Sequence, residues 1–471
     1  MLRMKNIIEL LRYNYLNHPQ KIFLNDDEVS LSYEQAYREV IRRASILFDM
    51  GLKKSPILVK VNRKADTLIN FFAILLSNNY FIPVDEDIPN EKLAKIIKAS
   101  KAEYYISTLI DDLDIKKIDL STQVKEVDYL NFELDFDENN YSYLIFTSGS
   151  TGEPKGVIKN HKNIIAFVNN FIDTFPFLSE ERIANQTPFY FDASMKDIFL
   201  VLKLGATLFI PNKTIFALPS ETVKYLNEKE ITYICWVPSI LTMIAKTRTL
   251  SYLKPAYLRY IYFVGEVFQV KYLNMWIEAL PHIRYFNLYG SSEVMGVCLY
   301  HEIKGIYDRE VLPLGQPIKN NQVTLVDNEI FIKSDQVALG YINSDNSHFS
   351  NGGYYSGDYA KYDEDGDIVF TSRKDYQIKH LGYRIELQEI EAALTNLEYI
   401  DSCCAIYDDT NDKIILFAVT NRELDNPSKS IISDAKEKLQ FYMIPNKVKI
   451  LSEMPFNSNG KIDRVKLKGL C

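Results

Sequence analysis

The stretch Thr147-Ser148-Gly149-Ser150-Thr151-Gly152-Glu153-Pro154-Lys155-Gly156 carries the strongest signal in this sequence. It follows an apolar strand candidate at residues 141–146 and precedes a segment, 164–175, in which apolar residues recur at helical spacing. Small residues let backbone N–H groups approach an anion, the hydroxyls add donors, and Lys155 adds a positive charge. The stretch therefore has the chemistry needed to cradle a polyphosphate between a strand and a helix.

This stretch is not a Walker P-loop. Pro154 stands where the second glycine of that motif would be, and Lys155 is followed by glycine rather than by Ser or Thr. A Ser/Gly-rich segment taken alone is more often a flexible loop. The flanking strand and helix and the Pro-Lys-Gly ending favour the phosphate-binding interpretation here.

Alternating strand and helix patterns predict an α/β fold in which a large N-terminal domain is built from mostly parallel βα units. Ligands in such sheets bind at the carboxyl ends of the strands, so the loops after Phe146, Val264 and Leu288 should hold the chemistry. Gly205 is placed to end one of the helices. The expected strands lie at 206–210, 232–237, 258–264 and 283–288, and the expected helices at 195–204, after Pro238 and at 267–280.

The pattern changes after about residue 350, where turn signals and short strands replace the βα units. From residue 375 the sequence predicts a helix at 386–397, strands at 400–407 and 413–420, and a second helix. This is the size and pattern of a small α+β domain. We therefore expect a large domain at residues 1–374 and a small C-terminal domain at residues 375–471.

Composition excludes several classes of protein. With 54 Lys+Arg and 62 Asp+Glu the net charge is −8, so neither nucleic acid nor an anionic membrane is attracted overall. The five cysteines have no metal or redox spacing, which favours a reducing compartment, and the six histidines have no metal-ligand spacing on one helix, which argues against a zinc site. No apolar run approaches about 18 residues, the length that would indicate a membrane-spanning helix. We expect a cytoplasmic protein without nucleic-acid or membrane partners.

The decapeptide resembles the phosphate loop of the adenylate-forming enzymes. These include acyl- and aryl-CoA ligases, luciferases and the amino-acid adenylation domains of nonribosomal peptide synthetases, with the D-alanine–carrier-protein ligases in the last branch. Four further segments resemble motifs of this superfamily, in its order, and residues 1–140 fit more loosely. They are Tyr289-Gly290-Ser291-Ser292-Glu293, Tyr355-Ser356-Gly357-Asp358, Ser372-Arg373-Lys374-Asp375 with the following loop, and Asn459-Gly460-Lys461-Ile462-Asp463. The motifs of the superfamily usually have Pro, Thr and Gly at the positions of Ser291, Ser292 and Ser372.

The resemblance implies ATP and Mg²⁺ as cofactors. Tyr289 would stack on adenine, Asp358 would accept from the ribose hydroxyls, and Glu293 would hold Mg²⁺, which prefers carboxylate oxygen. Without the motifs, these residues would be a core aromatic, a surface ion-pair partner and a solvated glutamate at a helix start. The implied nucleotide-binding residues are Thr147, Ser148, Gly149, Ser150, Thr151, Gly152, Lys155, Asn287, Tyr289, Gly290, Ser291, Ser292, Asp358 and Arg373.

Lys461 is, by the same resemblance, the catalytic cation, with Glu293 as the second catalytic residue. In carboxyl adenylation a carboxylate displaces pyrophosphate from the α-phosphorus, so two anions must meet and catalysis is mainly positioning and charge neutralisation. Without the resemblance, a lysine that follows Asn, Ser and Gly would be expected to lie in an ordinary exposed turn.

Asp192 indicates which carboxylic acid is activated. By resemblance, an aspartate here pairs with the α-ammonium of an amino-acid substrate, whereas its alternative role is to cap the following helix. Lys196 leaves two possibilities open, an acidic substrate side chain if it points inward and an apolar one if it points outward. A small amino acid, as in the D-alanine–carrier ligases, is also possible. The implied pocket contains Asp192, Ala193, Lys196, Cys235, Tyr262, Val264, Leu288, Gly296 and Val297.

The adenylate would then pass to a thiol after the small domain rotates about the hinge residue Asp375, with Lys379 and Gly382 in the loop that faces the thiol. No carrier segment follows Lys461, so we expect a separate phosphopantetheine-bearing carrier protein. The sequence thus predicts an amino-acid adenylating ligase. The alternatives are an acyl- or aryl-CoA ligase and a non-catalytic nucleotide-binding module.

Overall fold

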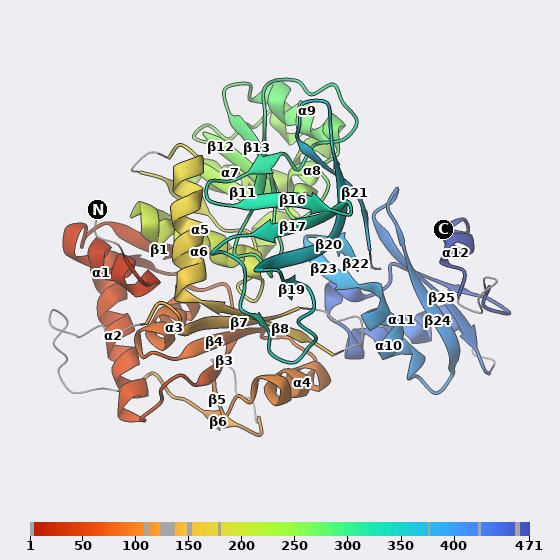
Figure 1. The fold of residues 1–471 in the computed structure, drawn as a ribbon, viewed down its shortest axis with the longest axis horizontal. Coiled ribbons are helices and arrows are strands. Elements are labelled where there is room, and N and C mark those ends of the chain that lie inside the picture. Colours follow the sequence, from red (N-terminus) through yellow and green to blue (C-terminus); the bar gives the residue numbers. More distant parts are fainter. Residues whose placement is uncertain are drawn as a thin grey trace. The chain divides into compact units, whose positions relative to one another are not determined.

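The computed structural model describes residues 4–107, 113–122, 137–147, 153–177, 180–374, 377–422, 425–456 and 462–471 (Figure 1). The chain divides into two compact units. The first contains residues 1–86, 99–145 and 156–372, and the second contains residues 87–98, 146–155 and 373–471. The expected domain boundary at residues 374 and 375 stays a prediction, because residue 375 lies outside the described ranges.

One sheet of the described chain carries both strands that flank the decapeptide. Its central strands β4, β3 and β5 are parallel, and β4 is almost entirely buried, as expected for a parallel strand covered on both faces. In spatial order the strands are β18 (Gly340–Tyr341), β8 (Lys155–Asn160), β7 (Tyr141–Thr147), β4 (Tyr80–Asp85), β3 (Pro56–Val61), β5 (Tyr104–Ile106) and β6 (Lys116–Lys117).

A second sheet holds the predicted βα units of the middle of the chain. Six neighbouring strands from β1 to β13 are parallel, and β2, β14 and β15 are antiparallel at its edges. In spatial order the strands are β15 (Gln316–Pro317), β14 (Leu299–Ile303), β13 (Arg284–Tyr289), β12 (Tyr260–Val264), β11 (Tyr233–Trp236), β9 (Arg182–Ala184), β10 (Thr207–Ile210), β1 (Ile22–Asp26) and β2 (Ser30–Ser32).

The helices of the first unit bury apolar faces against these sheets. α3 is buried along its whole length except at Asp66, and α6 is buried along nearly its whole length. α6 also contacts α1 and α5. The helices are α1 (Ile7–Asn17), α2 (Tyr33–Asp49), α3 (Ala65–Leu76), α5 (His161–Thr174), α6 (Asp192–Leu204), α7 (Pro219–Glu228), α8 (Pro238–Lys246) and α9 (Val270–Ala279), with short 3₁₀ turns at Lys213–Ala217 and Thr249–Ser251. The helix α4 (Asn90–Ser100) falls mostly in the second unit.

Figure 1 shows a smaller sheet, drawn in teal, in which β16, β17 and β20 lie side by side. The hairpin between β16 and β17 turns at Asp327 and Asn328, which both have positive φ, as a two-residue type I′ turn requires. Ile330, Ile332 and Tyr354 form its buried core. The strands are β16 (Gln322–Val326), β17 (Glu329–Lys333), β19 (Phe349–Ser350), β20 (Gly353–Tyr362) and β21 (Ile368–Arg373).

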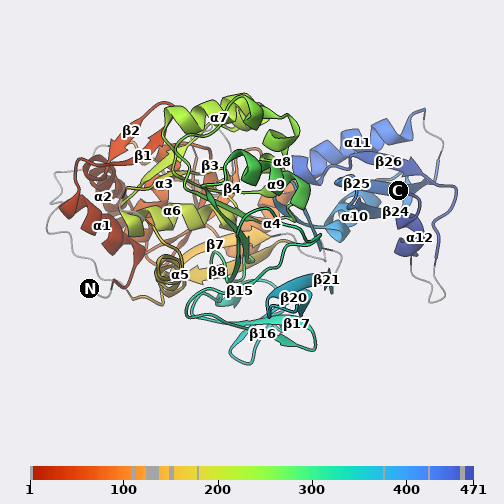
Figure 2. The same cartoon turned by 90° about the horizontal axis from the view of Figure 1, so that it is seen from above.

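The second unit has the predicted α+β pattern. Figure 2 shows α10 and α11 beside a sheet whose order is β24-β25-β26, and both helices contact it. The elements are β22 (Gln377–His380), β23 (Tyr383–Glu386), α10 (Leu387–Thr395), β24 (Ile400–Asp408), β25 (Lys413–Thr420), α11 (Pro427–Lys438), a 3₁₀ turn at Phe441–Met443, β26 (Lys447–Ile450) and α12 (Arg464–Lys468). The expected fold class is confirmed for both parts of the chain.

Gly205 ends α6 in the left-handed conformation, with φ of 58°, as its position after the helix predicts. A Cβ atom there would lie 2.6 Å from Oδ1 of Asn14. Asn14 is held in place, because its Nδ2 donates to the carbonyls of Leu10 and Leu202 at 2.9 and 2.7 Å. The site therefore excludes a side chain for reasons of space as well as of backbone strain.

We expect Gly205→Ala to lower the free energy of unfolding by about 2–4 kcal/mol, from left-handed strain together with disturbed buried hydrogen bonds. Gly51→Ala is the matched control, since Gly51 also has positive φ but faces open space, and it should cost only about 1 kcal/mol. Urea unfolding measures both. Equal losses in the two variants would contradict the packing argument.

Candidate active site

A buried tyrosine connects three segments of the first unit. The hydroxyl of Tyr143, on β7, donates to Asp192 at 2.8 Å and lies 2.8 Å from Sδ of Met295. Asp192 begins α6, and Met295 lies in the loop after β13. Tyr143 is fully buried. One hydroxyl thus joins a strand of the seven-stranded sheet to a helix and to the carboxyl end of a strand from the other sheet.

Asp192 is a buried carboxylate rather than a helix cap. The N-cap residue of α6 is Phe191, and no side chain caps the helix, so the capping role considered for Asp192 is wrong. Its exposed fraction is 6%. Burial raises the pKa of Asp192 to about 6, although the nearby Lys159 ammonium and the hydrogen bond from Tyr143 oppose that rise. The carboxylate is therefore mostly ionised at neutral pH.

Glu293 lies in a turn after β13 and is only 1% exposed, so the alternative of a solvated glutamate at a helix start is wrong. The hydroxyl of Tyr341, on β18, donates to Oε1 of Glu293 at 2.7 Å. The carbonyl of Glu293 also accepts from the backbone N–H of Ala338 at 2.8 Å. Side chain and backbone together fix this carboxylate in position.

Lys159, on β8, is a charged residue whose importance the sequence analysis missed. It is 0% exposed, and its Nζ has no hydrogen-bond partner among the described residues. Burial lowers the pKa of Lys159 to about 8, while attraction to Asp192 and Glu293 opposes that fall. The only signal in the sequence was a lysine two residues after Val157, on the same buried face of the strand.

Three of the residues assigned to the nucleoside, Asn287, Tyr289 and Asp358, lie in the first unit. Tyr289, the last residue of β13, donates its hydroxyl to Asp358 on β20, and each is 5% exposed. Asn287 donates to the carbonyl of Pro313 at 2.7 Å. The backbone N–H of Asp358 donates to the Ser356 hydroxyl at 3.0 Å. The structure thus brings Tyr289 and Asp358 together, with the Tyr289 hydroxyl on the Asp358 carboxylate and the Ser356 hydroxyl on the Asp358 backbone.

The loop after Tyr289 folds back on itself and depends on two glycines. A Cβ atom on Gly290 would lie 2.3 Å from the carbonyl oxygen of Gly296. Gly296 has φ of +71°, and a Cβ atom there would lie 2.3 Å from the ring of Phe167. Inside the loop, the buried hydroxyl of Ser291 has no hydrogen-bond partner among the described atoms, and Ser292 is half-buried. Such a compact loop can offer hydroxyl groups to a phosphate.

Part of the predicted site falls outside the described residues. Thr147 ends β7 and Lys155 begins β8, and both side chains are half-buried. Arg373, at the end of β21, and Lys379, on β22, are also half-buried. Gly382 forms a two-residue turn with Leu381, and both have positive φ. The residues outside are Ser148, Gly149, Ser150, Thr151, Gly152, Asp375 and Lys461, and their roles stay predictions.

Of the two orientations left open for Lys196, the outward one is wrong. Its side chain is 2% exposed, so it does not extend into solvent, and its ammonium pairs with the neighbouring Asp197. Burial alone would lower the pKa of Lys196, but the Asp197 charge outweighs it and the pKa is raised. Asn185 donates to the other carboxylate oxygen of Asp197 at 3.2 Å. The lysine charge is therefore already balanced within α6.

The other pocket residues lie on neighbouring strands or loops. Cys235 on β11 is in register with Tyr262 on β12, and Val264 on β12 with Leu288 on β13. Tyr262 is fully buried and stacks on Phe286 with the ring centroids 4.8 Å apart. Cys235, Leu288 and Val297 are also buried, Val264 and Gly296 are half-buried, and Ala193 is exposed.

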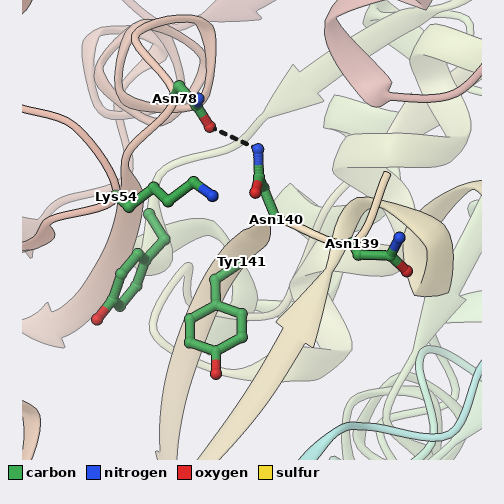
Figure 3. A pocket seen from close by; sticks show the side chains of 6 residues that line it. Lys54, Asn78, Asn139, Asn140 and Tyr141 are labelled. Carbon is green, nitrogen blue, oxygen red and sulfur yellow. Dashed lines mark hydrogen bonds between the residues drawn. The ribbon is translucent and has the colours of Figure 1, made fainter. Parts of the chain in front are cut away.

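A separate hollow, drawn in Figure 3, lies at the opposite end of the seven-stranded sheet. Its volume is about 260 Å³, and Tyr80 and Tyr141 on its wall are the first residues of β4 and β7. Ligands of parallel sheets bind at the carboxyl ends, so this hollow is not assigned to the site. Asn140 donates to Asn78 across it at 2.9 Å, and Lys54 and Asn139 complete the lining.

None of the described helices is both long and apolar enough to cross a membrane. Among the same residues, no cluster of three or more His, Cys, Asp or Glu side chains could hold a metal ion by itself.

Comparison with known proteins agrees with this geometry. Residues 11–342 match the family described as AMP-binding enzyme, and residues 389–461 match the AMP-binding enzyme C-terminal domain. A D-alanine–D-alanyl carrier protein ligase of Staphylococcus aureus (strain Newman) is 29% identical over 98% of this chain and 99% of its own. The ligase of the bovine strain RF122 / ET3-1 is 30% identical with the same coverage.

Solved structures share the fold. An o-succinylbenzoate CoA synthetase from Bacillus subtilis has a TM-score of 0.87 at 18% identity, covering 98% of each chain. A Vibrio cholerae adenylation domain in complex with glycyl-adenosine-5′-phosphate has a TM-score of 0.86 at 18% identity, covering 100% of this chain and 98% of its own. Family match, fold and ordered motifs agree: the chain belongs to the AMP-binding enzymes, as an AMP-forming ligase of the adenylate-forming superfamily.

Proposed function

We propose that this ligase activates a small amino acid as aminoacyl-AMP, with release of pyrophosphate, and transfers it to the phosphopantetheine thiol of a separate carrier protein. The observation that carries the proposal is the buried carboxylate of Asp192 at the start of α6. A buried charge is costly unless a cation or hydrogen bonds compensate it. Lys159 is a single buried ammonium that acts on two buried carboxylates, Asp192 and Glu293, so the α-ammonium group of an amino acid would supply a further cation that a simple carboxylic acid lacks.

The size and charge of the side chain follow from the rest of the pocket. Because Asp197 already balances Lys196, the basis for an acidic substrate side chain is lost. Leu288, Tyr262 and Val297 are buried and close-packed, which favours a small neutral side chain. The relatives described as D-alanine–D-alanyl carrier protein ligases support alanine as the first candidate.

The nucleotide is assigned to the other residues of the site. Tyr289 and Asp358 would hold the adenosine, and Glu293 would hold Mg²⁺ together with phosphate oxygens. The fixed carboxylate of Glu293 fits such an ion, since Mg²⁺ is commonly bound by one or two carboxylates plus substrate phosphates. When bound, the ion would neutralise charge on the phosphates. Lys461 and Lys155 would supply further positive charge where the two anions meet.

Transfer to a carrier protein is supported by the names of the relatives. A fused adenylation–carrier protein from Klebsiella oxytoca also shares the fold, with a TM-score of 0.83. Asp375, Lys379 and Gly382 are the residues assigned to this second half-reaction. The tight turn at Leu381 and Gly382 gives that segment a defined shape.

The direct test is ATP–pyrophosphate exchange with each amino acid in both D and L forms, and with propionate as the acid that lacks only the amino group of alanine. A small amino acid should drive exchange, and propionate should do so poorly. Exchange driven by propionate or by larger acids without an amino group would instead support an acyl- or aryl-CoA ligase. No exchange with any acid would support a nucleotide-binding module.

Lys461→Ala should fold normally and lose adenylation by about 100- to 1,000-fold, because one charge-stabilising donor typically contributes that much. Pyrophosphate exchange measures the loss, and urea unfolding checks the fold. Lys466→Ala, at an exposed lysine of α12, is the matched control and should keep full activity. Exchange near the wild-type rate in Lys461→Ala would refute the assignment.

Asp192→Asn keeps the acceptor for Tyr143 but removes the negative charge. We expect the KM for the amino acid to rise by about 100-fold or more, since breaking a buried charge pair costs about 3 kcal/mol or more. The KM for ATP should change little. Asp173→Asn, at an exposed aspartate of α5, is the control. An equal rise in both KM values would show that Asp192 has a general structural role.

Asp192 should also set the pH dependence of amino-acid use. Its pKa is raised to about 6, so the carboxylate is ionised above that pH and protonated below it. We expect kcat/KM for the amino acid to fall about tenfold per pH unit below pH 6, with the KM for ATP much less affected. A profile that stays flat down to pH 5 would contradict this role.

A further inference from the structure

The proposed chemistry gives no role to Lys159, a charged residue of the site. Its ammonium is completely buried on β8, and no hydrogen bond to a described residue satisfies its three donors. A buried ammonium without compensation is strongly unfavourable. Something in its surroundings must therefore keep the charged form there.

Lys159 lies beside β7, where the Ser142 hydroxyl donates to the Lys159 carbonyl at 3.1 Å, and the next residue along β7 is Tyr143. Asp192, from α6, and Glu293, from the loop after β13, act on Lys159, and Tyr143 from β7 is hydrogen-bonded to Asp192. His161, two residues along the chain, adds no competing cation, because burial lowers its pKa to about 4. Two buried carboxylates thus share one buried ammonium.

We propose that Lys159 is a positioning residue, a permanent internal counter-charge that keeps the Asp192 carboxylate ionised and in place before the substrate arrives, and so sets the discrimination between amino acids and plain carboxylic acids. This inference rests on the proposed function, since it gives Asp192 a substrate ammonium to receive. Lys159 is too deeply buried to reach solvent, so it acts through Asp192 and not by touching the substrate.

The alternative is that Lys159 only fills space in the wall of the site. The two roles predict different effects of replacing Lys159 by an uncharged residue. A space-filling residue can be replaced by methionine, which has a similar length and no charge. A counter-charge cannot, because its loss leaves Asp192 and Glu293 buried with no cation between them, and an uncompensated buried charge is strongly destabilising.

A double-mutant cycle on the full chain tests the pairing without any substrate. Lys159→Met, Asp192→Asn and the double variant are compared with the wild type by urea unfolding. We expect each single variant to unfold at lower urea, and the double variant to recover, with a midpoint above that of Lys159→Met. Lys162→Met is the control, since Lys162 is 43% exposed and pairs with Asp335 on the surface. It should unfold near the wild-type midpoint.

Kinetics test the functional role. In Lys159→Met we expect the KM for alanine to rise at least about tenfold at pH 7 and the KM for ATP less than about threefold. The acid limb of the alanine kcat/KM profile should move to higher pH, which a purely structural defect would not cause. The ratio of kcat/KM for alanine to that for propionate should fall at least about tenfold.

Each outcome decides the matter. Additive losses in the cycle, or failure of both Lys159→Met and the double variant to fold, would overturn the pairing. An unchanged alanine KM, or equal rises for alanine and ATP, would overturn the positioning role. If the wild-type enzyme shows no exchange with any amino acid, the proposed function is refuted. The double-mutant cycle uses no substrate, so it still tests the pairing of Lys159 with Asp192.

Discussion

A negative charge held away from water is the constraint on which the rest of this site depends. In the proposed function, Asp192 would have to be buried to exclude water from the substrate and ionised to attract an ammonium group. These demands conflict, because burial favours the neutral acid. The Tyr143 hydroxyl and the Lys159 ammonium resolve the conflict from two neighbouring strands, β7 and β8. The fold of the first unit can be understood as the framework that brings them together.

Two sheets are needed to build this arrangement. One supplies Tyr143 and Lys159, the other supplies Glu293 and Met295 at the carboxyl end of β13, and α6 carries Asp192 to the same place. The parallel strands of the second sheet also end near Tyr289, which is bonded to Asp358. Adenosine, metal and substrate functions are thus assigned to the ends of buried strands, where backbone geometry is most firmly fixed.

Much of the fold could be predicted from the sequence, because the patterns that indicate strands, helices and turns are local. The βα alternation predicted the parallel sheets, and Gly205 was placed correctly because few residues other than glycine tolerate the left-handed conformation at a helix end. The burial of Glu293 could not be predicted, because it depends on Tyr341, far along the chain. The Lys196–Asp197 pair was missed because it uses neighbouring residues of one helix turn that would ordinarily point apart. Lys159 was missed because a lysine in a strand normally faces water.

The most direct measurement is a crystal structure of the enzyme with a non-hydrolysable alanyl-adenylate, such as the alanyl sulfamoyl adenosine. The account predicts the alanyl ammonium within hydrogen-bond distance of Asp192, the adenine against Tyr289 and the ribose hydroxyls on Asp358. An ammonium bound elsewhere, with Asp192 still facing only Tyr143 and Lys159, would contradict it.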